Sequence, residues 1–167
     1  MTDHPDEHVL VPDAPSFRDV LGRFATGITI ITAMDGDEPV GLAANSFTSV
    51  SLDPPLVLFC PAITSSSWPR IERAGRFAVN ILDASQEDVC RIFSTPVDDR
   101  FAQVAWHRSP NGSPLLDQVH AFLDCTVWAV HEAGDHMVVI GEVQDLGVDD
   151  QAGPLLYYRG RYARLSD

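Results

Sequence analysis

The hydrophobic residues that follow position 15 recur at helical spacing. Phe17, Val20, Leu21 and Phe24 stand three or four positions apart, which places them on one face of an α-helix. Ser16 stands directly before them, where serine is favoured as an N-cap because its hydroxyl accepts a bond from a free backbone N–H. The pattern predicts a short amphipathic helix that begins near Ser16.

From Thr26 onward, apolar and β-branched residues form short runs that are separated by turn signals. The run 26–34, TGITIITAM, is followed by the turn Asp35–Gly36–Asp37 and by a second apolar run at 39–44, and this order predicts a β-hairpin. Further strands are expected at 46–51, 56–60, 77–82, 121–131, 136–148 and 155–158. Strands therefore dominate the predicted fold.

Two helical patterns interrupt these strands. One covers 68–74, with Pro69 in its first turn, and the other covers 85–93, with Ser85 as the expected cap. A doubly wound sheet needs a helix after nearly every strand. Because the helices are so few and so short, the sequence predicts a mainly β, antiparallel barrel.

The distribution of charge separates a tail from a single domain and limits the ligands. Residues 1–15 hold four acids, three prolines and no lysine or arginine, so we expect a flexible acidic tail before one domain at 16–167. The whole chain has 24 acids against 11 bases and a net charge of −13. Binding to nucleic acid or to an anionic membrane is therefore unfavourable. All the bases are arginines, so a phosphate site would use planar guanidinium groups or backbone amides.

Other features bear on the compartment and on metals. No apolar run reaches the roughly 18 residues of a membrane span, and the first residues lack the basic start and apolar centre of a secretion signal, so we expect a cytoplasmic protein. The three cysteines are widely spaced in apolar surroundings, which is typical of reduced core thiols. Outside the acidic tail no two histidines have HxxxH or HxH spacing, so no metal site is expected.

Small polar residues gather in an unusual way at 41–55, GLAANSFTSVSLDPP. Asn45, Ser46, Thr48 and Ser51 place hydrogen-bonding groups in a segment that should be strand. One interpretation is an edge strand with a solvated face. The other is a platform for a planar, hydrogen-bonding heterocycle, closed by the rigid turn at 53–55.

Three further segments could contact a ligand, and each has an ordinary structural alternative. The serines and threonine at 64–67 precede a helix, where they could bind phosphate or only cap the helix. His136 stands at the mouth of a predicted hairpin, where it could meet a ligand or only be solvated. The segment 157–162 combines tyrosines with arginines and could receive a nucleotide or be an ordinary last strand.

Several nucleotide and hydrolase motifs are missing from the sequence. There is no GxGxxG after the first strand, no GxxxxGK[ST] and no GxSxG. A bound nucleotide would therefore not be held by a Rossmann domain.

The ordered set of these segments resembles the short-chain flavin reductase family over about residues 17–164. The segments are 17–27, 41–55, GRFAVNIL at 75–82, Gly134–Asp135–His136 and the ending PLLYYRGRY. The resemblance is to reductase components that serve flavin-dependent monooxygenases. It implies a flavin-binding split β-barrel that forms a homodimer, with FAD or FMN in a groove at the subunit interface. It also implies that NADH reduces this flavin, which a partner monooxygenase then receives.

The resemblance also implies roles for individual residues. The isoalloxazine and ribityl chain would be surrounded by Thr26, Gly27, Ala43, Ala44, Asn45, Ser46, Val50 and Ser51. The phosphates would meet Ser65, Ser66 and Ser67, and the remainder of the nucleotide would lie along Arg76 and Phe77. The nicotinamide cofactor would contact His136 as an orienting catalytic residue, supported by Arg159 and Tyr162.

One departure and two alternatives accompany this resemblance. The family often has threonine where this chain has Ala43, so one hydroxyl toward the flavin is missing. A split-barrel oxidase of the pyridoxamine-phosphate type is an alternative, against which the absence of a basic phosphate cluster argues. A non-catalytic flavin-binding protein is the second alternative.

Overall fold

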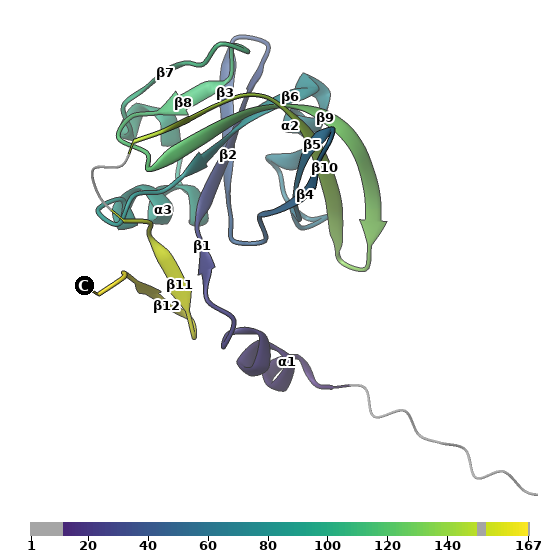
Figure 1. The fold of residues 1–167 in the computed structure, drawn as a ribbon, viewed down its shortest axis with the longest axis vertical. Helices are drawn as coiled ribbons and strands as arrows, with labels where there is room; N and C mark the ends of the chain where they lie inside the picture. The colour runs from purple at the N-terminus through teal and green to yellow at the C-terminus, as the bar shows by residue number, and fades with distance from the viewer. Residues whose placement is uncertain (1–11, 150–152, 167) are drawn as a thin grey trace, which may run out of the picture.

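The computed structural model describes residues 12–149 and 153–166 (Figure 1). Most of the predicted tail at 1–15 lies outside the described residues. Its last two residues begin α1, which spans Ala14–Leu21. Asp13 is the N-cap, and its side chain accepts a hydrogen bond of 2.7 Å from the Ser16 backbone N–H. The predicted helix is therefore present, but the prediction of Ser16 as its cap is wrong.

A seven-stranded antiparallel sheet forms the body of the molecule. Its order is β3-β2-β6-β9-β10-β5-β4. The strands are β2 (Thr29–Asp35), β3 (Glu38–Ala44), β4 (Thr48–Leu52), β5 (Pro55–Phe59), β6 (Arg76–Ile81), β9 (Ala121–Ala133) and β10 (His136–Val148). Only residues 45–47 connect β3 to β4, although these strands lie at opposite edges of the sheet. The sheet must therefore curl until its edges approach each other, which makes it a barrel.

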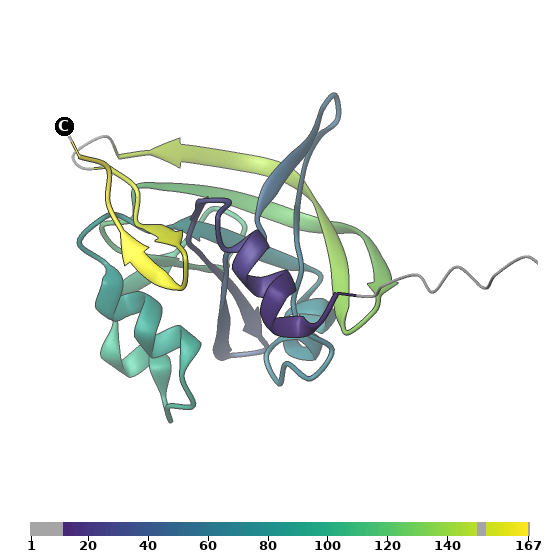
Figure 2. The same ribbon diagram turned by 90° about the horizontal axis from the view of Figure 1, so that it is seen from below.

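Smaller elements surround this barrel. A three-stranded sheet contains β1 (Thr26–Gly27), β11 (Leu156–Tyr158) and β12 (Arg161–Ala163), and a short hairpin contains β7 (Trp106–Arg108) and β8 (Pro114–Leu116). The remaining helices are α2 (Trp68–Ala74), α3 (Glu87–Ser94) and the 3-10 helix η1 (Arg100–Gln103). Figure 2 shows α1 in front of the barrel end with the β11–β12 hairpin beside it, and the Arg159 backbone N–H donates to the Gly22 carbonyl at 2.8 Å. No helix of the described residues is long and apolar enough to cross a membrane.

The core has two parts because the side chains of β2 alternate between its two faces. Ile31 belongs to the cluster inside the barrel, which includes Phe59 and Phe77. Ile30 belongs to a second cluster, between the sheet and α3, which includes Phe93. β2 is therefore buried on both faces. Because β3 pairs with β2, it also lies between these two clusters.

The predicted hairpin at 26–44 and the strands that follow it are confirmed, with small shifts of their ends. The helix at 68–74 is confirmed with the predicted ends. The cap predicted for the next helix is wrong, because α3 begins at Glu87 and the Ser85 backbone N–H donates to Asp83 Oδ1 at 2.8 Å. The pattern also missed β7, β8, β12 and η1, each of only three or four residues.

Candidate functional site

Three hollows follow β3 and the link after it. β3 lies at one edge of the sheet, so its outer side pairs with no strand of the described residues. Residues 38–41 line the first hollow together with Ser66 and Ser67, and we call it the serine hollow. Residues 43–45 line the second together with Tyr157 and Tyr162, and we call it the tyrosine hollow. Residues 45–47 line the third together with α1, and we call it the helix hollow.

The tyrosine hollow encloses about 280 Å³ and combines small residues with aromatic rings. Tyr157 and Tyr162 pack edge to face, with ring centroids 5.9 Å apart, and the Arg91 guanidinium carbon lies 5.0 Å from the centroid of Tyr162. The Tyr162 hydroxyl donates to Cys90 Sγ at 3.4 Å. Mainly because of burial, the pKa of Tyr162 is raised to about 12. Tyr162 therefore remains a neutral phenol at physiological pH and does not serve as a base.

The helix hollow, of about 580 Å³, adjoins the tyrosine hollow, since Asn45 and Tyr157 line both. Ser46 holds the link in place because its Oγ accepts a bond of 2.8 Å from the Cys60 backbone N–H. Thr26 also lines this hollow, and its Oγ1 is buried without a hydrogen-bond partner among the described residues. An unpaired buried hydroxyl costs free energy, so Thr26 is a candidate for a contact with a polar ligand.

His136 lies at the same end of the molecule as the helix hollow. Its position is fixed by an antiparallel bridge to Ala62, two residues after the Cys60 that contacts Ser46. The exposed imidazole Nδ1 lies 2.7 Å from Asp135 Oδ1. The hydrogen bond from His136 and its charge lower the pKa of Asp135, and the charge of Arg18, which lines the helix hollow, lowers it further. An approaching ligand would thus meet an imidazole held by a carboxylate.

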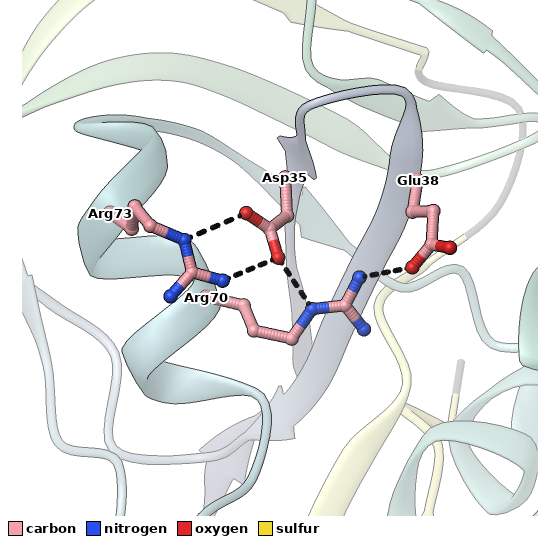
Figure 3. A network of polar contacts seen from close by, with 4 residues as sticks. All are labelled: Asp35, Glu38, Arg70 and Arg73. Carbon is pink, nitrogen blue, oxygen red and sulfur yellow. Dashed lines mark hydrogen bonds and ion pairs between the residues drawn. The ribbon is translucent and has the colours of Figure 1, made fainter.

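An ion-pair network joins α2 to the β2–β3 hairpin (Figure 3). It thereby also holds the segment 64–67, which directly precedes α2. Arg73 binds Asp35 through Nε at 3.0 Å and Nη2 at 2.6 Å, and Arg70 Nε donates to the same carboxylate at 2.8 Å. Arg70 Nη2 also donates to Glu38 at 2.9 Å. Hydrogen bonds from Arg73 and Arg70 lower the pKa of Asp35 to about 2. The network links the hairpin turn to the segment that carries Ser66 and Ser67.

The serine hollow, of about 830 Å³, contains two of the three predicted phosphate residues. Ser66 and Ser67 line it. The Ser65 hydroxyl is instead used by α2, because Ser65 Oγ accepts a bond of 3.2 Å from the Trp68 backbone N–H. Arg100 also lines this hollow, and no pattern in the sequence pointed to it. No spacing rule identifies a single arginine in an irregular segment that only the fold brings to β3.

Several predicted residues do not join this group in the single chain. Gly27 is exposed beside Thr26, and its Cα faces open space. Val50 and Ser51 lie on β4, at the opposite edge of the sheet, and line none of the three hollows. Arg159 is exposed at the β11–β12 turn, while Tyr162 lies beside Ala43 in the tyrosine hollow and not beside His136.

The structure separates Arg76 and Phe77 from the other predicted ligands. In the β2–β6 pair, Thr29 lies opposite Ile81, so the start of β6 is at the far end of β2 from Ala44. Arg76 lines a separate hollow, where it donates to the Asn111 carbonyl at 3.1 Å. The ring of Phe77 is fully buried against Phe59, with centroids 5.3 Å apart. The ring itself has no surface available to a ligand in the single chain, and the prediction that Arg76 and Phe77 lie along the nucleotide stays a prediction.

The curled antiparallel sheet places the chain among the mainly β split barrels, and the hollows beside its small polar residues are candidate ligand sites. The model of the family described as "Flavin reductase like domain" matches residues 21–166, and the chain belongs to this family. The predictions of family, fold class and flavin reductase activity are therefore confirmed.

Individual relatives carry more specific names. The chain is 49% identical over 153 residues to the flavin-dependent monooxygenase reductase subunit HsaB of Rhodococcus jostii, covering 92% of this chain and 78% of that protein. It is 41% identical to the NADH-dependent FMN reductase SmoA of Agrobacterium fabrum, covering 97% of this chain and 94% of that protein. Among solved structures, the NADH:FAD oxidoreductase SgcE6 of Streptomyces globisporus, in complex with NAD and FAD fragments, superposes with a TM-score of 0.88 at 38% identity. That match covers 92% of this chain and 93% of the other.

Proposed function

We propose that the chain is an NADH-dependent flavin reductase that reduces free FAD or FMN and supplies the product to a separate flavin-dependent monooxygenase. The observation that carries this proposal is the segment Ala43–Ser46, which lines two adjoining hollows at the same end of the molecule as His136. Membership of the flavin reductase family and the names of HsaB and SmoA support it.

The residues of the site act by holding and orienting two substrates. Hydride transfer from nicotinamide to flavin N5 is intrinsic to these molecules, so the protein has to stack them and exclude other poses. The small side chain of Ala43 and the backbone of Ala44 leave room for a flat ring beside β3. Asn45 and the unpaired Thr26 hydroxyl provide hydrogen bonds to it. No base is needed, so His136 orients the nicotinamide substrate.

We propose that two chains form a homodimer that completes the groove. None of the residues of α1 is buried, and Phe17, Val20 and Leu21 are 56%, 63% and 51% exposed. An apolar face of this kind on one wall of a ligand hollow is typical of an interaction surface. Val50 and Leu52 on β4 are also exposed, at 47% and 93%, so we place this strand in the same two-fold interface, where it would reach the groove of the other copy. Val50 and Ser51 would then contact flavin from across the interface.

Turnover separates this proposal from the alternatives. Purified protein is mixed with NADH or NADPH and with FAD or FMN, first without oxygen and then in air. A reductase bleaches the added flavin without oxygen and oxidises NADH continuously in air. An oxidase that retains its flavin would not respond to added free flavin. A storage protein would bind flavin stoichiometrically without steady NADH oxidation, and this result would contradict the proposal.

A further inference from the structure

We infer that Arg100 binds the phosphate group of the flavin in the serine hollow, an inference that rests on the proposed function. Arg100 begins η1 and lines the same hollow as Ser66 and Ser67. The hollow also borders Gly41, on the edge of β3. A guanidinium group and two serines thus face one space.

The guanidinium of Arg100 is held in a fixed orientation by the backbone. Nη1 donates to the Gly41 carbonyl at 3.2 Å and Nη2 donates to the Thr95 carbonyl at 3.0 Å. Nε is buried and has no hydrogen-bond partner among the described residues. A buried donor without an acceptor is unfavourable unless another group supplies one. The two backbone hydrogen bonds thus fix the orientation of the guanidinium before any ligand arrives, and the unpaired Nε leaves one donor without an acceptor.

Charge distinguishes Arg100 from the other arginine of the hollow. Arg70 is neutralised by ion pairs with Asp35 and Glu38. Within the described ranges, Arg100 forms no ion pair with a carboxylate, although Asp98 and Asp99 line the same hollow. Asp99 instead caps η1, accepting from the Ala102 backbone N–H at 3.1 Å. The positive charge of Arg100 remains available in a protein of net charge −13.

The chemistry and the position both favour the flavin phosphate. A planar guanidinium suits phosphate oxygens, and such charged hydrogen bonds are stronger than neutral ones. Gly41 and Asn45 are four strand positions apart, or about 13 Å at the usual rise of a strand. A flavin with its ring beside Ala43 and Asn45 would lie along the edge of β3 with its ribityl chain directed toward Gly41. The phosphate of FMN and the diphosphate of FAD share this chemistry.

The test compares ligands with and without phosphate. Dissociation constants for riboflavin, FMN and FAD are measured by fluorescence quenching for the wild type and for Arg100→Gln. We expect the wild type to bind FMN more tightly than riboflavin. In Arg100→Gln, the affinity for FMN and FAD should fall about tenfold, the effect of losing one charged hydrogen bond. The affinity for riboflavin should stay within about twofold, since riboflavin has no group for Arg100 to bind.

Other outcomes overturn the inference. An equal loss for riboflavin would mean that Arg100 acts by holding the loop against Gly41. An increase in the NADH Michaelis constant with unchanged flavin affinity would assign the hollow to the diphosphate of NADH. If the wild type neither binds flavin nor oxidises NADH with it, the proposed function itself fails. If the wild type does both and Arg100→Gln keeps its preference for FMN, only the role of Arg100 fails.

Two further variants control for charge and folding. Arg108→Gln removes the same charge from a residue that lines a different hollow, so its ratio of FMN to riboflavin affinity should equal that of the wild type. Arg100→Lys keeps the charge but loses the planar fork, so its ratio should fall between those of the wild type and Arg100→Gln. If Arg100→Gln fails to fold, the wild type still decides, because equal affinities for FMN and riboflavin would contradict the inference.

Discussion

His136 is the residue whose role in the reaction is most directly testable. We expect His136→Ala to raise the NADH Michaelis constant about fivefold, on the order of 1 kcal/mol of lost interaction. Flavin affinity should change less than twofold, because the imidazole lines none of the three hollows. His107→Ala is the matched control, since His107 is also exposed and also lies 2.9 Å from an aspartate oxygen, on Asp117. Steady-state kinetics in which both variants have the wild-type NADH constant would contradict the role of His136.

Ala43 offers a test of the small-residue wall beside the flavin. Ala43→Thr should tighten flavin binding by about 0.5 to 1.5 kcal/mol, because it adds a hydroxyl where the family often has threonine. Ala43 lines the tyrosine hollow and pairs with Ile30 in the sheet, where a β-branched residue is compatible with the strand. Ala43→Val has the same shape without the hydroxyl, and calorimetry should show no gain for it. Equal behaviour of the two variants would mean that shape, and not the hydroxyl, determines the effect.

At the level of residues, the sequence predicted the polar segment around Asn45 because small residues in a strand are unusual in themselves. The sequence did not predict that, of the adjacent residues Arg76 and Phe77, only Arg76 has a side chain at the surface. In the pair Arg76–Phe77, strand alternation and curvature bury Phe77 and leave Arg76 at the end of β2 away from Ala44. Arg100 carries no local signal, because its role depends on a contact with Gly41, 59 positions earlier.

Among the elements, α2 depends on an ion-pair network whose contribution should vary with pH. Hydrogen bonds from Arg73 and Arg70 lower the pKa of Asp35 from 3.8 to about 2. A depressed pKa in the folded state means that the stabilisation is fully present above pH 3.8 and is lost as the pH falls through 2. We expect Asp35→Asn to lower the thermal midpoint at neutral pH, and this deficit to shrink as the pH falls from 4 toward about 2.

The neighbouring Asp37 provides the control for that experiment. It lies in the same hairpin turn, is exposed and forms no ion pair within the described ranges. Asp37→Asn removes the same charge, and its thermal midpoint should stay close to that of the wild type throughout. A deficit of Asp35→Asn that does not change with pH would show that the network does not stabilise the folded state through the carboxylate.

Long elements were predictable because each has its own local signal. The hairpin at 26–44 combines β-branched runs with an acidic turn, and both long strands β9 and β10 are apolar over many residues. The short hairpin of β7 and β8 has no such pattern, since tertiary contacts hold it. Asn80 Oδ1, on β6, accepts a bond of 2.8 Å from the Leu116 backbone N–H. Elements stabilised in this way cannot be found from periodicity.

For the whole molecule, antiparallel strands and short helices indicated a barrel but not the way it closes. Closure follows from the link at 45–47, which joins the two edge strands and so curves the entire sheet. The same link forms the centre of the candidate site, since Asn45 and Ser46 line its hollows. The geometry of the site is therefore a consequence of global curvature, which no local pattern contains.

The proposed dimer gives the prediction that belongs to this scale. We expect the wild type to sediment at twice the mass of the 18.3 kDa chain. Val20→Asp places a charge on the exposed apolar face of α1, where it would be buried without a partner in a dimer, and should shift the protein toward the monomer. Since α1 forms a wall of the helix hollow, flavin affinity should fall together with dimerisation.

Arg23→Gln is the matched control for Val20→Asp. It changes the net charge by the same amount, but it places no charge on the apolar face of α1, because Arg23 lies just after the helix in an exposed pair with Asp19 at 3.1 Å. Exposed pairs of this kind contribute little to stability, so Arg23→Gln should remain dimeric and bind flavin as the wild type does. A monomeric wild type with full reductase activity would contradict the dimer. A Val20→Asp variant that remains dimeric would exclude α1 from the interface and direct attention to the other exposed apolar residues, such as Leu52 on β4.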